Sequence, residues 1–265
     1  MKMLDFHTHV FPDDLAERAI SKLREASPES VNYTNGTLCG LIGSMQANGV
    51  DVSVTLPIAT KESQVEVINL AAGSSKLKNI VAFGSLYPFA ANCDAHIDRL
   101  VTLGVKGIKL HPEYQNFYVD DSRFYPMYES LASAGLVILF HAGKDPAPFA
   151  TDHAQPAAIA RIVRHFPSLK IVAAHLGGWK QWEEVYEILA GENLYFDTSA
   201  LTGYLPPEQF VKILNRHGSD YVLFGTDSPW FDQGAVKLWI EELPVGDEIK
   251  EKIFWKNGAE LLEIE

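Results

Sequence analysis

The sequence predicts an α/β fold, namely a (β/α)8 TIM barrel that takes in residues 1–265 as a single domain. Three observations predict it. Eight short apolar runs alternate with stretches of helical periodicity. Most of these runs are almost continuously apolar, which is typical of parallel strands covered on both faces. The length of 265 residues and the 47% hydrophobic content match one such barrel better than two half-sized domains.

The expected strands are rich in β-branched and apolar residues and are bounded by glycine, proline or asparagine. In chain order they are Met3–His9, Asp51–Pro57, Ile80–Leu86, Val105–Leu110, Val137–His141, Lys170–His175, Leu194–Thr198 and Tyr221–Gly225. An open, doubly wound sheet is the alternative arrangement. It would need a phosphate-binding loop, and the sequence contains neither GxGxxG nor GxxxxGKS/T.

The expected helices fill the intervals between these strands. They are Asp13–Glu25 and Leu38–Asn48 in the first crossover, then Lys61–Lys76, Ala91–Leu103, Ser122–Ala134, Gln155–Phe166, Trp179–Ala190 and Pro206–His217, with Gly234–Leu243 and Gly246–Leu262 after the last strand. Gly49 and Gly104 stand just before the next strand, where a glycine commonly ends a helix. Two prolines, Pro206 and Pro207, open a later helix, because proline fits the first helical turn.

The composition excludes several function classes. The chain has 22 lysines and arginines against 34 aspartates and glutamates, so its formal net charge is −12, which disfavours nucleic-acid binding. Cys39 and Cys93 form no CxxC pair and are expected to be reduced. The N-terminus lacks a secretory leader, and no apolar run reaches membrane-spanning length. We therefore expect a cytoplasmic protein that acts on a small molecule, without a membrane partner, and a homodimer is the commonest assembly.

A pair of histidines ends the first strand. His7 and His9 are two residues apart, so both side chains leave an extended strand on one face, with Asp5 pointing the same way beneath them. Neutral imidazoles at the carboxyl end of a barrel strand suit a divalent metal ion. Histidines satisfied by backbone hydrogen bonds are the alternative interpretation. The pair indicates a metal site.

Three more polar residues end later strands. His141 follows VILF and precedes the small residues Ala142-Gly143, and we expect it to be a third metal ligand. Asp227 ends the eighth strand, which a closed barrel places beside the first, so it is expected to bind the same metal and to accept a proton from water. His175 ends the sixth strand and can serve as a ligand or as an acid/base, of which we favour the second.

The fourth strand carries Lys109 and His111 on one face. A buried ammonium group needs a carboxylate partner, a substrate anion or carboxylation into a bridging ligand. We expect Lys109 to be mainly a paired core lysine, and assign Lys109, His111 and Trp230 to the substrate pocket. Two other histidines, His153 in a long loop and His217 on a helix, are expected at the surface, with a lid over the site as the alternative role for the loop of His153.

With these residues assembled, the chain resembles the amidohydrolase superfamily, specifically the amidohydrolase-related branch that includes aminocarboxymuconate-semialdehyde decarboxylase. The resemblance covers essentially the whole chain. It is carried by DFHTH, GVKGIKLHP, FHAG, AHLGG and FGTDSPW, and by the closing segment IFWKNGAELLEI. The closing helix departs slightly from the family pattern, since Gly258 stands between Asn257 and Ala259.

The resemblance implies a fold and a ligand set. The fold is the metal-dependent TIM barrel. His7, His9, His141 and Asp227 would hold one divalent ion, usually zinc, and His175 would act beside it as catalytic acid/base. In the two-metal branches of the superfamily a carboxylated lysine bridges the ions, so a second ion is implied if Lys109 is carboxylated.

The sequence thus predicts a zinc-dependent hydrolase, in which a metal-activated water cleaves an ester, lactone or amide bond of a small molecule, with Asp227 and His175 as catalytic residues. The alternative is a nonoxidative decarboxylase of a small aromatic or dienoic acid. The absence of an arginine close after any strand favours hydrolysis, because no bidentate carboxylate clamp is evident. A non-catalytic metal-binding barrel is the third hypothesis, and it is disfavoured because all the expected ligands are present.

Overall fold

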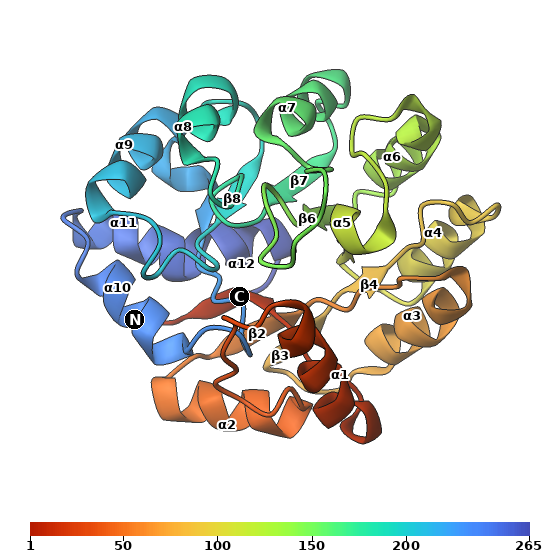
Figure 1. Cartoon of the computed structure of the whole chain (residues 1–265), viewed down its shortest axis with the longest axis horizontal. Coiled ribbons are helices and arrows are strands. Elements are labelled where there is room, and N and C mark those ends of the chain that lie inside the picture. Colours follow the sequence, from red (N-terminus) through yellow and green to blue (C-terminus); the bar gives the residue numbers. More distant parts are fainter.

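The computed structural model describes residues 1–265 and shows parallel strands at the centre of a ring of helices (Figure 1). The strands are β1 (Leu4–Thr8), β2 (Val52–Thr55), β3 (Ile80–Ala82), β4 (Gly84–Ser85), β5 (Gly107–Leu110), β6 (Val137–Phe140), β7 (Lys170–Ala173), β8 (Tyr195–Asp197) and β9 (Val222–Leu223). Their hydrogen-bonded order is β1-β2-β3 and β4 to β9 in sequence, with every pair parallel. Only Phe83 separates β3 from β4, so the two segments form one strand of the barrel.

Backbone contacts join the last strand to the first. The N–H of Phe6 donates to the carbonyl of Phe224 at 2.7 Å, and Thr8 pairs in parallel with Ser228, just beyond β9. These contacts bring the last strand beside the first, as in a barrel. The TIM barrel predicted from the sequence is confirmed, with strands somewhat shorter than expected.

The helices occupy the predicted intervals. They are α1 (Asp13–Ala26), α2 (Leu38–Asn48), α3 (Val65–Ser74), α4 (Cys93–Thr102), α5 (Pro112–Gln115), α6 (Tyr125–Ser133), α7 (Pro156–His165), α8 (Trp182–Glu184), α9 (Pro207–His217), α10 (Gln233–Glu241), α11 (Asp247–Glu251) and α12 (Asn257–Leu262). Two five-residue π-helices, Val185–Leu189 and Lys252–Lys256, extend α8 and join α11 to α12. The short α5 was not predicted. None of the helices combines the length and the apolar character that crossing a bilayer requires.

The core is apolar except at the carboxyl ends of the strands. One cluster of 54 buried hydrophobic residues and a second of 12 account for the packing of helices on strands and of the barrel itself. Among these residues lie fully buried ionisable side chains, including Asp5, His7, Lys109 and Asp197, each at most 1% exposed. Because burying such groups is unfavourable unless they are paired or bind a ligand, they mark a candidate site.

Candidate metal centre

Three side chains from the two ends of the chain meet at the barrel mouth. The Nε2 atoms of His7 and His9 lie 3.2 Å apart, and Asp227 Oδ1 lies 3.4 and 3.2 Å from them, respectively. Ligand atoms bound at 2.0–2.1 Å in a tetrahedral zinc site are about 3.3 Å from one another. The spacing of the three atoms therefore matches one face of a metal coordination sphere.

Asp5 holds the chain around Asp227 in place. Its Oδ1 accepts the N–H of Thr226 at 2.9 Å, and its Oδ2 accepts the Thr226 hydroxyl at 2.6 Å and the Gln233 amide at 2.7 Å. Burial raises the pKa of Asp5 to about 7, and these donors oppose the rise because they stabilise the carboxylate. The turn that follows puts Asp227 at a φ of 69°, an uncommon conformation for a residue other than glycine.

The acceptors around His7 and His9 set their tautomers. His7 Nδ1 lies 2.7 Å from Asp197 Oδ2, and His9 Nδ1 lies 2.8 Å from the carbonyl of Leu56. Both Nδ1 atoms therefore carry the hydrogen, which they donate, and both Nε2 atoms present a lone pair to the mouth. A carboxylate behind a ligand histidine is the usual support of a metal site.

His141 and His175 form a second pair of ring nitrogens. His175 Nδ1 donates to the Ser199 carbonyl at 3.2 Å, and His141 Nε2 donates to the Lys144 carbonyl at 3.0 Å. His141 Nδ1 and His175 Nε2 are left as lone pairs that face each other at 3.0 Å. Burial lowers the pKa of both rings well below the usual value, which keeps them neutral. Two facing lone pairs repel unless a cation lies beside them, so this donor set also fits a metal ion.

The structure thus divides the expected ligands between two neighbouring groups. His7, His9 and Asp227 offer ligand atoms within 4.8 Å of one another, and His141 does not belong to that cluster. His141 instead lies against His175, and the rings of His175 and His7 are 5.3 Å apart. All five side chains therefore border one mouth.

Lys109 lies at the floor of this mouth and differs from the prediction. Its side chain is 1% exposed, and its Nζ is 3.4 Å from His7 Nε2. No carboxylate oxygen lies within 4.0 Å of it, so the expectation of a paired core lysine was wrong. Burial lowers the pKa of Lys109 to about 8, a shift that the charges of Asp197 and Asp227 counteract.

The other predicted pocket residues lie at the rim. The ring of His111 stacks on that of His141 with centroids 4.2 Å apart, and its Nδ1 accepts the N–H of Tyr114. Trp230 is half-buried, and its backbone N–H donates to the carbonyl of Asp227 at 2.9 Å. The structure thus places His111 next to the histidine cluster and Trp230 next to Asp227.

Two histidines expected at the surface are buried, and those predictions were wrong. His153 is 8% exposed because its backbone N–H and its ring nitrogen Nδ1 both contact the carboxylate of Glu113. This contact ties the loop after β6 to α5. His217 is 6% exposed and stacks on Phe196 of β8. Neither position could be inferred from helical or loop periodicity, since each depends on a partner distant in sequence.

Sequence reasoning missed three functional side chains. Asp197 and Ser199 support His7 and His175 from behind, and Ser199 Oγ donates to Asp197 Oδ1. Asp197 ends β8 and lies within the expected seventh strand, so a signal similar to the one that identified Asp227 was also present there. Asp145 lies in the loop after β6, with Oδ2 3.4 Å from His111 Nε2 and 3.7 Å from His141 Nε2. No strand-end pattern points to it.

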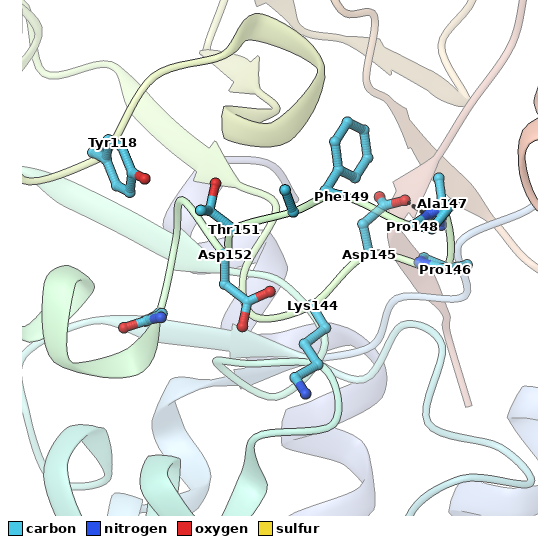
Figure 2. A pocket seen from close by; sticks show the side chains of 11 residues that line it. Tyr118, Lys144, Asp145, Pro146, Ala147, Pro148, Phe149, Thr151 and Asp152 are labelled. Atoms are coloured by element: carbon cyan, nitrogen blue, oxygen red, sulfur yellow. Dashed lines mark hydrogen bonds between the residues drawn. The ribbon is translucent and has the colours of Figure 1, made fainter.

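A cavity of about 610 Å³ is lined mainly by the loop after β6. Figure 2 shows residues from Lys144 to Asp152 along one curve of that loop, with Tyr118 coming from another segment. None of the histidines lines this cavity, but two of its lining residues contact them: the Lys144 carbonyl accepts from His141 Nε2, and Asp145 lies beside His111 and His141. The loop after β6 therefore contributes both to this cavity and to the surroundings of the histidines.

Comparison with known proteins assigns the family. The family model described as amidohydrolase matches residues 4–264, which is nearly the whole chain. The chain belongs to the amidohydrolase family. The resemblance expected from the strand-end motifs is thereby confirmed, and the chain is a member of a family of enzymes. No curated protein matches this amidohydrolase significantly.

Several solved structures share the fold of this amidohydrolase. An uncharacterised TIM-barrel protein from Bordetella bronchiseptica is 21% identical, with a TM-score of 0.77 and 99% of each chain covered. The 5-carboxyvanillate decarboxylase from Sphingomonas paucimobilis is 15% identical, with a TM-score of 0.75 and coverage of 100% of this chain and 99% of that one. A dihydroxybenzoic acid decarboxylase from a Polaromonas species, solved with manganese and the inhibitor 2-nitroresorcinol, is 15% identical, with a TM-score of 0.74 and coverage of 99% and 97%. Identities this low establish the fold alone.

Proposed function

We propose that this amidohydrolase is a metal-dependent nonoxidative decarboxylase of a small aromatic acid, with one divalent ion held by His7, His9, His141 and Asp227. The observation that carries the proposal is Lys109, a buried ammonium group without a carboxylate partner at the floor of the site. Burial lowers the pKa of Lys109 to about 8, and the charges of Asp197, Asp227 and Asp145 oppose this shift. A charge in this position needs an anion, and a substrate carboxylate supplies one.

This observation reverses the ranking that the sequence favours. Hydrolysis ranked first because no arginine follows a strand closely, so no bidentate carboxylate clamp was evident and a lysine would have to bind any substrate carboxylate. Lys109 is such a group, and its expected partner in the protein is absent. Two further points support the choice: solved decarboxylases have the same fold over the whole chain, and one of them contains manganese. We therefore propose a divalent ion without assigning zinc over manganese.

The residues around the mouth suit this reaction. Bound there, a divalent ion would supply Lewis-acid chemistry by fixing and polarising oxygen atoms of the substrate. The bond between the ring carbon and the carboxylate breaks, carbon dioxide leaves, and the electron pair that stays on the ring carbon takes up a proton. His175 is suited to carry that proton, because its Nδ1–H is fixed on Ser199 and its Nε2 faces the mouth.

The charges in the site favour this proton transfer. Burial lowers the pKa of His175, so its protonated form is a strong acid, and the substrate carboxylate favours that form while it is bound. Asp227, which lies against His7 and His9 at the same mouth, is the second group able to carry the proton. Solvent restores the proton after carbon dioxide has left, so the reaction consumes one proton for each molecule of substrate.

The test is release of carbon dioxide by the protein loaded with Mn²⁺ or Zn²⁺, assayed on a set of dihydroxybenzoates. We expect carbon dioxide and the corresponding phenol in equal amounts. In Lys109→Met the value of kcat/KM should fall about 100-fold or more, because a buried charge that pairs with the substrate is lost. Lys106→Met is the matched control, since Lys106 lies three residues away with a side chain 46% exposed. Cleavage of lactones or esters without any carbon dioxide from the acids would reverse the proposal in favour of hydrolysis.

A further inference from the structure

Gln233, the first residue of α10, is fully buried, although glutamine is mostly found at protein surfaces. The residue before it, Asp232, caps the helix by accepting the N–H of Ala235 at 2.8 Å, which fixes where the helix begins. From this first turn the side chain of Gln233 reaches β1, where its Nε2 donates to Asp5 Oδ2 at 2.7 Å. A residue of the outer ring of helices therefore contacts the strand that carries two of the proposed metal ligands.

The amide of Gln233 is oriented for Asp5 alone. An ionised carboxylate only accepts hydrogen bonds, so the amide nitrogen faces Asp5 and the amide oxygen points away from it. This oxygen, Oε1, is buried and has no hydrogen-bond partner. An unpaired buried acceptor is unfavourable, and an apolar side chain such as methionine would fill a similar space without one. Packing alone therefore does not explain a glutamine at this position, whereas the hydrogen bond to Asp5 does.

Asp5 joins the two segments of chain that carry His7 and Asp227. Its Oδ1 accepts the backbone N–H of His7 at 3.2 Å and that of Thr226, the residue before Asp227, at 2.9 Å. Its Oδ2 accepts the hydroxyl of Thr226 at 2.6 Å together with the amide of Gln233. The orientation of this one carboxylate therefore affects the backbone of both proposed ligands. Without Gln233, Oδ2 would keep the Thr226 hydroxyl as its only donor.

We propose that Gln233 is a positioning residue of the metal centre and that it acts through Asp5. By holding the carboxylate, it fixes the backbone that carries His7 and Asp227. When this donor is lost, the carboxylate is free to turn, the spacing of the ligand atoms is less well fixed, and the ion binds more weakly. The inference rests on the proposed function only in that it takes His7 and Asp227 as metal ligands. It adds α10, which contributes no ligand, to the elements that build the site.

The test is a double-mutant cycle on metal affinity. Competition with a chelator of known affinity gives the Kd of each protein for Mn²⁺. Gln233→Met, which keeps the approximate size of the side chain, should bind the ion about 10-fold more weakly, and Asp5→Asn about 10- to 100-fold more weakly. In the double variant the Kd should stay within about 2-fold of that of Asp5→Asn, because Gln233 acts only through Asp5. A substitution that merely destabilises the fold would not show this coupling.

The matched control is Ser53→Ala. Ser53 pairs with Asp5 in register on β2 and is equally buried, but its hydroxyl makes no hydrogen bond. This variant should keep the wild-type Kd. A Gln233→Met protein with the wild-type Kd overturns the inference, and so do effects of the two substitutions that multiply in the double variant, because Gln233 would then act independently of Asp5. If Asp5→Asn does not fold, the comparison of Gln233→Met with Ser53→Ala decides the inference.

Metal binding is measured separately from release of carbon dioxide, so the two proposals can fail separately. A wild type that binds Mn²⁺ but releases no carbon dioxide contradicts the proposed function, while the cycle still tests Gln233. A wild type that releases carbon dioxide, with a Kd for Mn²⁺ that Gln233→Met leaves unchanged, contradicts the role of Gln233 alone. A wild type that binds no divalent ion contradicts both.

Discussion

Asp197 lies behind the proposed metal ligands and holds two of the histidines in place. Its Oδ2 accepts the Nδ1–H of His7 at 2.7 Å, and its Oδ1 accepts the backbone N–H of His175 at 2.9 Å and the hydroxyl of Ser199. One fully buried carboxylate thus fixes the ring of a ligand and the backbone of the proposed acid. A substitution that keeps the size of Asp197 but removes its charge should weaken the positioning of both the His7 ring and the His175 backbone.

We expect Asp197→Asn to bind Mn²⁺ about 10- to 100-fold more weakly than the wild type, because the ligand His7 loses the acceptor that sets its tautomer and its orientation. Competition with a chelator of known affinity measures the change. Asp220→Asn is the control, since that side chain is 64% exposed and pairs with Lys252 on the surface. Equal affinities in the two variants would show that Asp197 does not support the metal.

The predictability of single residues depends on where they lie. The histidines and Asp227 follow apolar runs, so a barrel necessarily brings them to one end, and they could be identified from the sequence. Asp197 carries the same signal within LYFDTS and could have been identified as well. Asp145 could not, because the shape of the loop after β6 brings it to His111, and composition does not determine that shape. The environment of Lys109 likewise depends on distances between side chains in the folded structure, which the spacing of residues in the sequence does not give.

At the scale of elements, the contact between α9 and β8 depends on a neutral imidazole. His217 ends α9 and stacks on Phe196 with centroids 3.9 Å apart. Its Nδ1 accepts the N–H of Gly191 at 3.1 Å, and its Nε2 donates to the carbonyl of Leu194 at 3.1 Å. A second ring proton would face the Gly191 N–H, and burial lowers the pKa of His217 from 6.5 to about 4.

This shift predicts a pH dependence of stability. Below pH 6.5 His217 binds a proton in the unfolded chain, whereas in the folded chain it does so only near pH 4. The neutral ring therefore stabilises the folded state fully above pH 6.5, and this stabilisation is lost as the pH falls towards 4. One group changes the free energy of unfolding by about 1.4 kcal/mol per pH unit at most, or about 3 kcal/mol over this range. Denaturant unfolding of His217→Gln from pH 4 to 7 should show a pH dependence shallower than that of the wild type by this amount. A parallel pair of curves would contradict it, and His165→Gln, on an exposed part of α7, controls for the substitution.

The elements themselves could be predicted well, and the exceptions have local causes. Every expected strand occurs, because each is a short apolar run between turn residues. The strand expected at Ile80–Leu86 is interrupted at Phe83, and the helix expected at Gly246–Leu262 contains a π-helical stretch, neither of which alters the hydrophobic pattern. The four-residue α5 was missed because it is too short to show periodicity. Its Glu113 binds His153, which explains why that loop residue is buried.

At the scale of the whole molecule, the proposed metal centre lies where the first and last strands of the barrel meet. His7 and His9 belong to the first strand, Asp227 follows the last, and the N–H of Asp227 donates to the carbonyl of His7 at 2.8 Å. The first and last strands are separated by most of the chain, so the unfolded state rarely brings these ligands together. A bound ion therefore favours the closed barrel over the unfolded chain.

We expect Mn²⁺ at a free concentration of 100 times its Kd to raise the free energy of unfolding by about 2.7 kcal/mol, since the ion binds the folded state alone. For a chain of this size that corresponds to an increase in Tm of about 5 to 10 °C. Thermal unfolding with the metal and with a chelator measures it. His9→Ala removes one of the three clustered ligands and should lose most of the increase, whereas His165→Ala, which changes an exposed histidine of α7, should keep it. An equal increase in Tm in both variants would place the ion away from the first and last strands. The barrel mouth would then have to bind its substrate without a metal ion.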